Sequence, residues 1–239
     1  MSKNQSSGLN NLTISIDTGG TFTDVVVADE YQNFTLGKAL TTRERVFLGV
    51  DKALESAAKK LGYTVEALLN SSQLVIYGTT HATNAIVTGS TAKTAFLTTA
   101  GFPDILVMRE GGKFDPHDFS KDYPKPYIPR RYTYEIEERI TATGSVYHAI
   151  NRAQVDQVID KLRSHQFDAC AVCLLWSTVN SSHERQLGTW LEEALPHLSV
   201  TLSHELNPTL REYRRASSAA IDASLKPLMQ SHFDQLSRD

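Results

Sequence analysis

Apolar and polar residues alternate at the start of the chain, and the alternation ends at a pair of glycines. Residues 12–17 (LTISID) alternate and then meet Thr18-Gly19-Gly20, which predicts a strand that enters a tight turn. Residues 23–29 predict the returning strand, and residues 34–40 predict a third. Because the first two strands are joined by so short a loop, we expect a hairpin rather than a βαβ unit.

After residue 40 the spacing of the apolar residues changes to that of a helix. The apolar face of a helix from about Thr42 to Gly62 carries Val46, Val50, Leu54, Ala57 and Leu61. The pattern next predicts a short helix (64–70), a strand (73–78), a helix (80–88) and a strand (94–99). The resulting order, β-β-β-α-β-α, is the most informative organisational feature of the chain.

The second half has a different organisation. Residues 109–131 hold four of the eight prolines and predict a long loop of functional or flexible character. The pattern then predicts a strand (132–140), a helix (151–165), a buried strand (169–176), a helix (181–195), a strand (199–204) and a helix from 210 to about 235. We therefore expect a disordered leader (1–11), a subdomain with the glycine turn (12–145) and a smaller α/β subdomain (146–239).

Composition excludes several classes of protein. The net charge of −3 and the scattered basic residues argue against a nucleic-acid partner. No stretch approaches the roughly 20 apolar residues of a membrane span, and the polar N-terminus does not resemble a signal peptide, so we expect a cytoplasmic protein. Cys170 and Cys173 lie three apart on a predicted strand, where their side chains point to opposite faces. We therefore expect core cysteines and no metal or redox pair.

The turn at residues 17–24 (DTGGTFTD) is the strongest candidate site. Its two glycines allow the backbone to approach a ligand, and its N–H groups with the Thr21 and Thr23 hydroxyls suit a phosphate. Asp17 is placed to hold a hydrated Mg²⁺ or, alternatively, to position a nucleophile. Neither Walker nor Rossmann spacing is present. An ordinary hairpin turn is the competing interpretation, and the surrounding strands and helix favour phosphate.

Two further segments carry candidate chemistry. Residues 78–84 (GTTHATN) stand where a strand gives way to a helix, and their hydroxyl, amide and N–H groups suit a phosphate, carboxylate or amide. The alternative is that Thr79 or Thr80 only caps the helix. Arg109 begins the loop REGGK, whose charges suit an anionic substrate, although the pattern slightly favours a solvated surface loop.

Five ordered stretches resemble the N-terminal region of hydantoinase A, 5-oxoprolinase and the acetone carboxylase β subunit. They are IDTGGTFTD (16–24), GTTHATNA (78–85), LTTAGFPDIL (97–106), PKPYIPRR with ERI (124–131, 138–140) and EYRRAS with LKP (212–217, 225–227). The glycine turn on its hairpin also resembles the first phosphate motif of the actin, Hsp70 and sugar-kinase superfamily. The resemblance implies an α/β, ribonuclease H-like (actin-like ATPase) first lobe with a mixed sheet and flanking helices.

The resemblance also implies a function. Relatives use ATP to phosphorylate a carbonyl or amide oxygen, and then hydrolyse a cyclic amide or, alternatively, carboxylate a ketone; a non-catalytic nucleotide-binding scaffold is a third possibility. The implied cofactors are ATP and Mg²⁺. The implied partners are a cyclic amide or ketone substrate and a C-terminal lobe or hydantoinase B-like subunit. The chain is then a first lobe, expected to bind ATP weakly alone.

The site residues that follow from the motifs and the resemblance fall into three groups. Candidate catalytic carboxylates are Asp17, also the candidate metal ligand, and Asp24. Candidate nucleotide-binding residues are Thr18, Gly19, Gly20, Thr21 and Thr23. Candidate substrate-binding residues are Thr79, Thr80, Thr83, Asn84 and Arg109. The sequence departs from the family pattern at Tyr77 and His81, which leaves no histidine at position 77 and makes His81 a weaker catalytic candidate.

Overall fold

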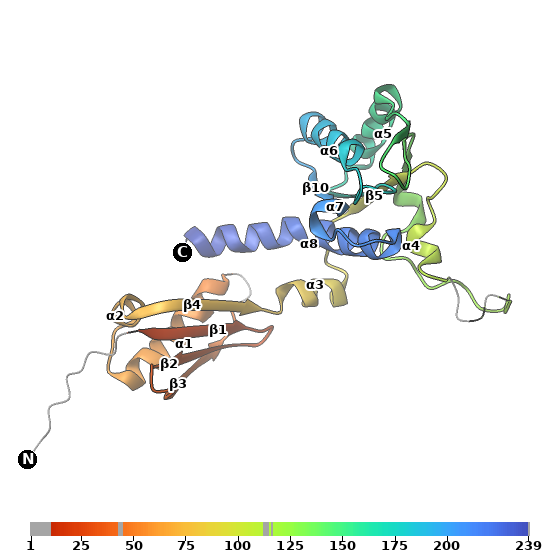
Figure 1. Ribbon diagram of the computed structural model, residues 1–239. Coiled ribbons are helices and arrows are strands. Elements are labelled where there is room, and N and C mark those ends of the chain that lie inside the picture. The colour runs from red at the N-terminus through yellow and green to blue at the C-terminus, as the bar shows by residue number, and fades with distance from the viewer. Residues whose placement is uncertain (1–10, 43–44, 112–114, 116, 239) are drawn as a thin grey trace, which may run out of the picture. The chain divides into compact units, whose positions relative to one another are not determined.

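A computed structural model describes residues 11–42, 45–111, 115 and 117–238, so the expected leader lies outside it except for Asn11. The chain forms two compact units (Figure 1). The first runs up to Ser90 and includes the segment from Ser231 onward, and the second is Thr91–Gln230.

The first unit is a mixed sheet with a helix packed on one face. Its strands are β1 (Leu12–Thr18), β2 (Phe22–Ala28), β3 (Phe34–Leu40) and β4 (Ser72–Thr79), in the order β3-β2-β1-β4. The β1–β2 and β2–β3 pairs are antiparallel, whereas β1 and β4 are parallel. Its helices are α1 (Val46–Leu61), α2 (Val65–Asn70) and α3 (His81–Thr88). The predicted order β-β-β-α-β-α is confirmed. The short helix predicted between the first long helix and the fourth strand is present as α2.

Alternation along the strands builds the core of this unit. Leu12, Ile14 and Ile16 of β1 are buried, and they pack with apolar residues of α1. A Cβ added at Gly37 of β3 would lie 2.1 Å from the Ala53 carbonyl oxygen, so this glycine lets α1 approach the sheet closely. The helix begins at Val46 rather than near Thr42, and it ends at Gly62, which adopts φ 76° as expected.

The second unit is built on a parallel sheet. Its strands are β5 (Thr94–Thr99), β6 (Thr133–Ile136), β9 (Ala169–Cys173) and β10 (Ser199–Leu202), in the order β10-β9-β5-β6. A small ladder joins β7 (Arg139–Ile140) and β8 (Val146–His148). The helical segments are α4 (Ile105–Met108), η1 (Arg130–Tyr132), α5 (Arg152–His165), α6 (Ser182–Ala194), α7 (Ser203–Leu206) and α8 (Glu212–Arg238), whose last residues belong to the first unit.

The two units divide the chain at Ser90, not near residue 145 as the sequence pattern suggested. The reason is strand pairing: β5 and β6 precede residue 145, yet β5 pairs with β9, so these strands belong to one sheet with the later elements. The predicted strand 132–140 is also divided into β6 and β7. Between them, the buried Glu138 carboxylate lies 2.7 Å from the buried His183 Nδ1 instead of continuing the alternation.

The two cysteines lie on opposite faces of this sheet, as their spacing predicted. Cys170 belongs to the core cluster formed with residues of α5 and α6, whereas Cys173 belongs to the cluster formed with residues of α8. Both thiols are buried and free, and burial raises the pKa of each, that of Cys173 to about 12. None of the described helices is long and apolar enough to cross a membrane.

Candidate functional site

The glycine loop closes the β1–β2 hairpin in a narrow turn. The backbone N–H of Gly19 donates to the carbonyl oxygen of Phe22 at 2.9 Å. A Cβ on Gly19 would lie 3.3 Å from that oxygen, and one on Gly20 would lie 3.4 Å from the Asn84 side-chain nitrogen. The two glycines therefore keep the turn tight and leave its backbone accessible beside α3.

Thr41, just after β3, holds the loop in place. Its N–H donates to the Thr21 carbonyl at 2.9 Å, and its hydroxyl donates to the Gly19 carbonyl at 3.0 Å. Because that hydroxyl proton is engaged, the Thr23 hydroxyl 3.0 Å away is the donor in the Thr23–Thr41 bond. Thr41 is outside the sequence motifs, and its available signal is its position directly after the strand that pairs with β2.

The second motif lies beside the first because β4 runs parallel to β1. The N–H of Thr80 donates to the Thr18 carbonyl at 3.3 Å. Thr80 occupies the position before α3, but its side chain caps no helix N–H; its hydroxyl instead accepts from the Asn84 amide at 3.3 Å. The Thr79 hydroxyl accepts from the N–H of His81 at 3.1 Å. Simple helix capping therefore does not account for Thr80.

A cavity of about 530 Å³ opens between the two motifs. Its lining residues are Thr18, Gly19, Gly20, Thr21, Thr41, Val46, Thr79, Thr80, His81, Asn84, Thr88, Ser90 and His232. The hydroxyl of Thr18 is buried and has no hydrogen-bond partner among the described residues.

Both candidate carboxylates lie outside this cavity. Asp17 and Asp24 are paired across β1 and β2, on the sheet face opposite α1. Asp24 forms an ion pair with Lys38 at 2.7 Å. Asp17 is exposed at the end of β1, and a Cβ at Gly78 would be 3.9 Å from its Oδ1, so the glycine leaves space beside the carboxylate.

Three other candidates are also absent from the cavity lining. Thr23 is fully buried and is engaged by Thr41, so it supports the loop and does not line the cavity. Thr83 is exposed on α3. Arg109 belongs to the second unit and lines a different cavity there. The structure thus brings residues 18–21 together with Thr79, Thr80 and Asn84 in the lining of one cavity.

A cluster of three rings adjoins the cavity, and the sequence did not indicate it. The Tyr77 hydroxyl lies 3.0 Å from Nε2 of His232, and the His232 ring stacks on that of His81 with centroids 5.0 Å apart. Burial, and secondly the neighbouring His81, holds the pKa of His232 below its usual range. His232 is 155 positions from Tyr77, and no local pattern connects them.

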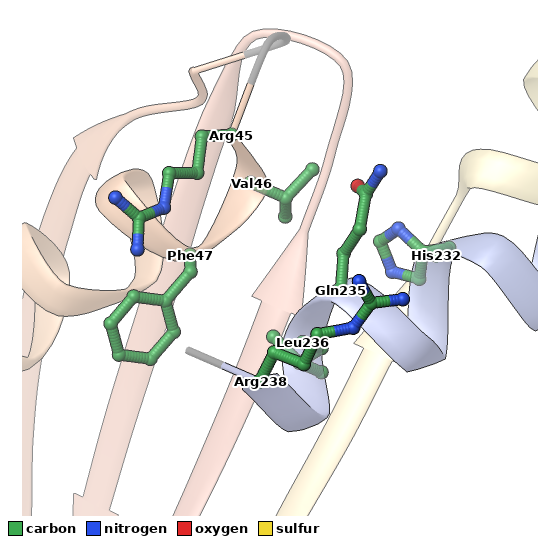
Figure 2. Close-up of a pocket in the computed structure, with 7 residues that line it drawn as sticks. All are labelled: Arg45, Val46, Phe47, His232, Gln235, Leu236 and Arg238. Atoms are coloured by element: carbon green, nitrogen blue, oxygen red, sulfur yellow. The ribbon is translucent and has the colours of Figure 1, made fainter.

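A smaller cavity of about 280 Å³ lies next to the first (Figure 2). The beginning of α1 and the end of α8 line it, with Arg45, Val46, Phe47, His232, Gln235, Leu236 and Arg238. Val46 and His232 line both cavities. Arg45 and Arg238 contribute two basic side chains to this lining.

The sequence of the chain is similar to those of known proteins. The model of the hydantoinase/oxoprolinase N-terminal region matches residues 13–195. The chain is 35% identical to the caprolactamase subunit alpha of Pseudomonas jessenii over 93% of this chain and 32% of that subunit. It is 29% identical to the acetophenone carboxylase gamma subunit of Aromatoleum aromaticum, over 92% of this chain and 32% of that one.

Solved structures are similar as well. The crystal structure of the ATP-dependent caprolactamase from Pseudomonas jessenii has a TM-score of 0.82 at 34% identity, covering 94% of this chain and 33% of that one. The nucleotide-free structure of acetone carboxylase also reaches 0.82, at 22% identity, over 93% of this chain and 33% of that one. Both support the expected α/β fold of an actin-like first lobe. The chain spans about a third of the length of these relatives.

Proposed function

The chain belongs to the hydantoinase/oxoprolinase N-terminal region family, and we propose that its first unit binds the phosphates of ATP in the cavity between residues 18–21 and Thr79–Asn84. The observation that carries the proposal is the lining of this cavity, in which the glycine turn and the start of α3 bring hydroxyl, amide and backbone groups together. Thr18 is one of the lining residues, and its buried hydroxyl has no partner among the described residues. The volume of the cavity, about 530 Å³, lies within the usual range for ligand sites.

The proposed contacts follow from the chemistry of the lining. Phosphate oxygens accept hydrogen bonds, and the loop offers the N–H of Gly20, the N–H of Thr21 and the hydroxyl of Thr18 as donors. The bond from Thr41 to the Gly19 carbonyl fixes the peptide that leads into these donors. A preorganised set of donors stabilises charge on a transferring phosphoryl group without reorganisation during the reaction.

A magnesium ion fits the carboxylate at the end of β1. Mg²⁺ prefers one or two carboxylates together with phosphate oxygens and waters, and Asp17 is an exposed carboxylate with free space beside Gly78. Asp24 is neutralised by Lys38, so it is the weaker ligand of the two and supports the electrostatics of the site. When bound, the ion would neutralise charge on the phosphates.

We further propose that the phosphoryl group is transferred to a carbonyl or amide oxygen of a small molecule. The amide oxygen would attack the γ-phosphorus and ADP would leave, so that the carbon bearing the new phosphate ester becomes open to attack by water. Asn84, Thr79 and Thr80 are the polar groups of the cavity suited to orient that substrate. The parts corresponding to the rest of the relatives, or a hydantoinase B-like subunit, would complete the enzyme.

Titration with Mg-ATP tests the phosphate site. The variant Thr18→Val keeps the size of the buried side chain and removes the hydroxyl, and we expect it to weaken ATP binding about tenfold. Thr13→Val on the opposite face of β1 is the matched control and should leave the affinity unchanged. Equal affinities for wild type and Thr18→Val would refute the proposal.

A substrate screen on the complete enzyme tests the chemistry. Lactams and hydantoins, and separately ketones with bicarbonate, are supplied with ATP while ADP release is measured. We expect ADP release that depends on a lactam or hydantoin and is lost in Asp17→Asn. ADP release only with ketone and bicarbonate would assign a carboxylase instead. Full activity of Asp17→Asn in the assembled enzyme would favour a scaffold role for this chain.

A further inference from the structure

The second unit contains its own cavity, of about 510 Å³, at the carboxyl end of β5. The lining consists of Gly101, Phe102, Pro103, Asp104, Ile105, Met108, Arg109 and Glu110 with Arg211, Glu212 and Tyr213 at the start of α8. Ligands of parallel sheets bind beyond the carboxyl ends of the strands. This cavity therefore occupies the position where such a fold places a ligand.

The carboxylates of this cavity are largely neutralised by arginines outside it. Glu110 accepts from Arg214 at 2.8 and 3.2 Å, and Asp104 accepts from Arg130 at 2.6 Å. The hydrogen bond from Arg214 is the main reason why the pKa of Glu110 lies below its usual value, so that carboxylate is ionised and engaged at neutral pH. Glu110 also has a Coulombic interaction with Arg211, one of the two cations that line the cavity, so it balances part of that charge.

Those cations, Arg109 and Arg211, retain donor capacity. Arg109 makes one long hydrogen bond, from its guanidinium to the Lys125 carbonyl at 3.4 Å. Within the part of the chain that the structure describes, the Arg211 side chain makes no hydrogen bond or ion pair. A guanidinium has five N–H donors, so both side chains are available to a ligand. Glu212 is the one lining carboxylate without an ion-pair partner among the described residues.

The rest of the lining is apolar. Phe102 and Met108 are 40% and 47% exposed, and Ile105, Pro103 and the ring of Tyr213 complete an apolar wall. Exposed apolar side chains beside cations form a surface for a ligand with a hydrocarbon body and an anionic end. A bare inorganic anion would leave this wall in contact with water.

Both arginines have backbone angles with positive φ. Arg109 adopts φ 56° and ψ −140°, and Arg211 adopts φ 76°. Residues other than glycine are strained in such backbone conformations. Two of the six described non-glycine residues with positive φ therefore line this cavity. Strained residues concentrate at ligand sites, where the surrounding structure holds them in place.

We propose that this cavity binds a small organic carboxylate, with its carboxylate between Arg109 and Arg211 and its hydrocarbon body against Phe102 and Met108. Arginine pairs well with planar carboxylates through parallel hydrogen bonds. Glu212 disfavours a second negative charge, so a monoanion fits better than a phosphate dianion. The proposal is independent of the ATP site and requires no nucleotide.

The test is titration of the full chain with hexanoate, monitored by calorimetry and by saturation-transfer NMR. We expect saturable binding that Arg211→Gln and Arg109→Gln each weaken about tenfold. Hexylammonium, which has the same body and the opposite charge, should not bind. The matched control is Arg163→Gln on α5, an exposed arginine paired with Asp160 outside this cavity. Thr18→Val should leave hexanoate binding unchanged, which separates this site from the ATP site.

A second variant guards against loss of folding in the arginine variants. Met108→Glu places a negative charge on the half-exposed apolar wall, and we expect it to abolish hexanoate binding while circular dichroism stays native. Three results would overturn the proposal: no saturable hexanoate binding, equal binding of hexylammonium, or displacement of hexanoate by lower concentrations of inorganic phosphate. Unchanged affinity in folded Arg211→Gln would do the same.

Discussion

The Thr41 hydroxyl donates to the Gly19 carbonyl oxygen at 3.0 Å, which links the end of β3 to the loop between β1 and β2. The same peptide group carries the N–H of Gly20, a residue that lines the cavity, so the bond fixes the orientation of that peptide. A residue 22 positions away in sequence thus fixes the loop geometry. The loop is preorganised by a neighbouring strand and not only by its own glycines.

We expect Thr41→Val to weaken Mg-ATP binding about tenfold. It should also lower the free energy of unfolding by about 2 kcal/mol, because the Thr41 hydroxyl makes two hydrogen bonds that each contribute about 1 kcal/mol. Calorimetric titration and urea unfolding measure the two quantities. The control is Thr35→Val near the start of β3, the strand that precedes Thr41, at the end away from the loop. If both variants bind ATP equally well, the Thr41 bond has no part in positioning the loop.

Two glycines in the first unit should respond differently to alanine. At Gly37 an added Cβ would lie 2.1 Å from the Ala53 carbonyl, so Gly37→Ala must push α1 from the sheet and should cost more than about 2 kcal/mol of unfolding free energy. At Gly20 the Cβ would meet only the Asn84 side chain at 3.4 Å, so Gly20→Ala should fold normally and bind ATP more weakly. A melting temperature lowered equally in both would contradict this distinction.

The fold of the first unit was predictable from sequence because its signals are local. Alternation in residues 12–17, the glycine pair and the helical period ending at Gly62 each determine structure within a few residues, and the structure has a strand, a turn and a helix there. The pairing of β5 with β9 was not predictable, because it joins strands about 75 positions apart with no sequence signature. The expected boundary near residue 145 differed from the structure for this reason.

The candidate site was likewise predictable where its signals are local and not where they depend on the tertiary fold. Thr18, Gly19, Gly20 and Thr80 were identified from motifs, and they line one cavity because β1 and β4 are parallel neighbours. The motif does not distinguish the two faces of the sheet, so it groups Asp17, which lies on the face opposite α1, with the residues that line the cavity. Thr23 of β2 is absent from the lining for another reason, since it is fully buried and bonded to Thr41. His232 required the tertiary fold, since α8 carries it and nothing near it in sequence indicates a site.

Chemical labelling tests the interpretation of the two cysteines. Burial raises the pKa of the Cys173 thiol to about 12, and that of Cys170 is raised as well, so neither forms thiolate at neutral pH. We expect the native chain to resist Ellman's reagent at about pH 8 and to release two equivalents of thiol once unfolded in guanidinium. Rapid labelling of either cysteine in the native chain would show that the β9 strand is more accessible than its burial indicates.

The contact of His232 with Tyr77 and His81 should make the stability of the first unit depend on pH. The pKa of His232 is below the ordinary value of 6.5, chiefly because of burial and secondly because of His81. As pH falls through 6.5, the unfolded chain takes up a proton that the folded chain resists. The free energy of unfolding should therefore be highest above pH 6.5 and decrease as the pH falls below that value. It should become constant again below the pKa of His232 in the folded chain. Urea unfolding between about pH 5 and pH 8 measures the effect; His232→Gln should flatten the profile, whereas exposed His148→Gln should not. A wild-type profile that rises as pH falls would have the wrong sign for a buried neutral imidazole.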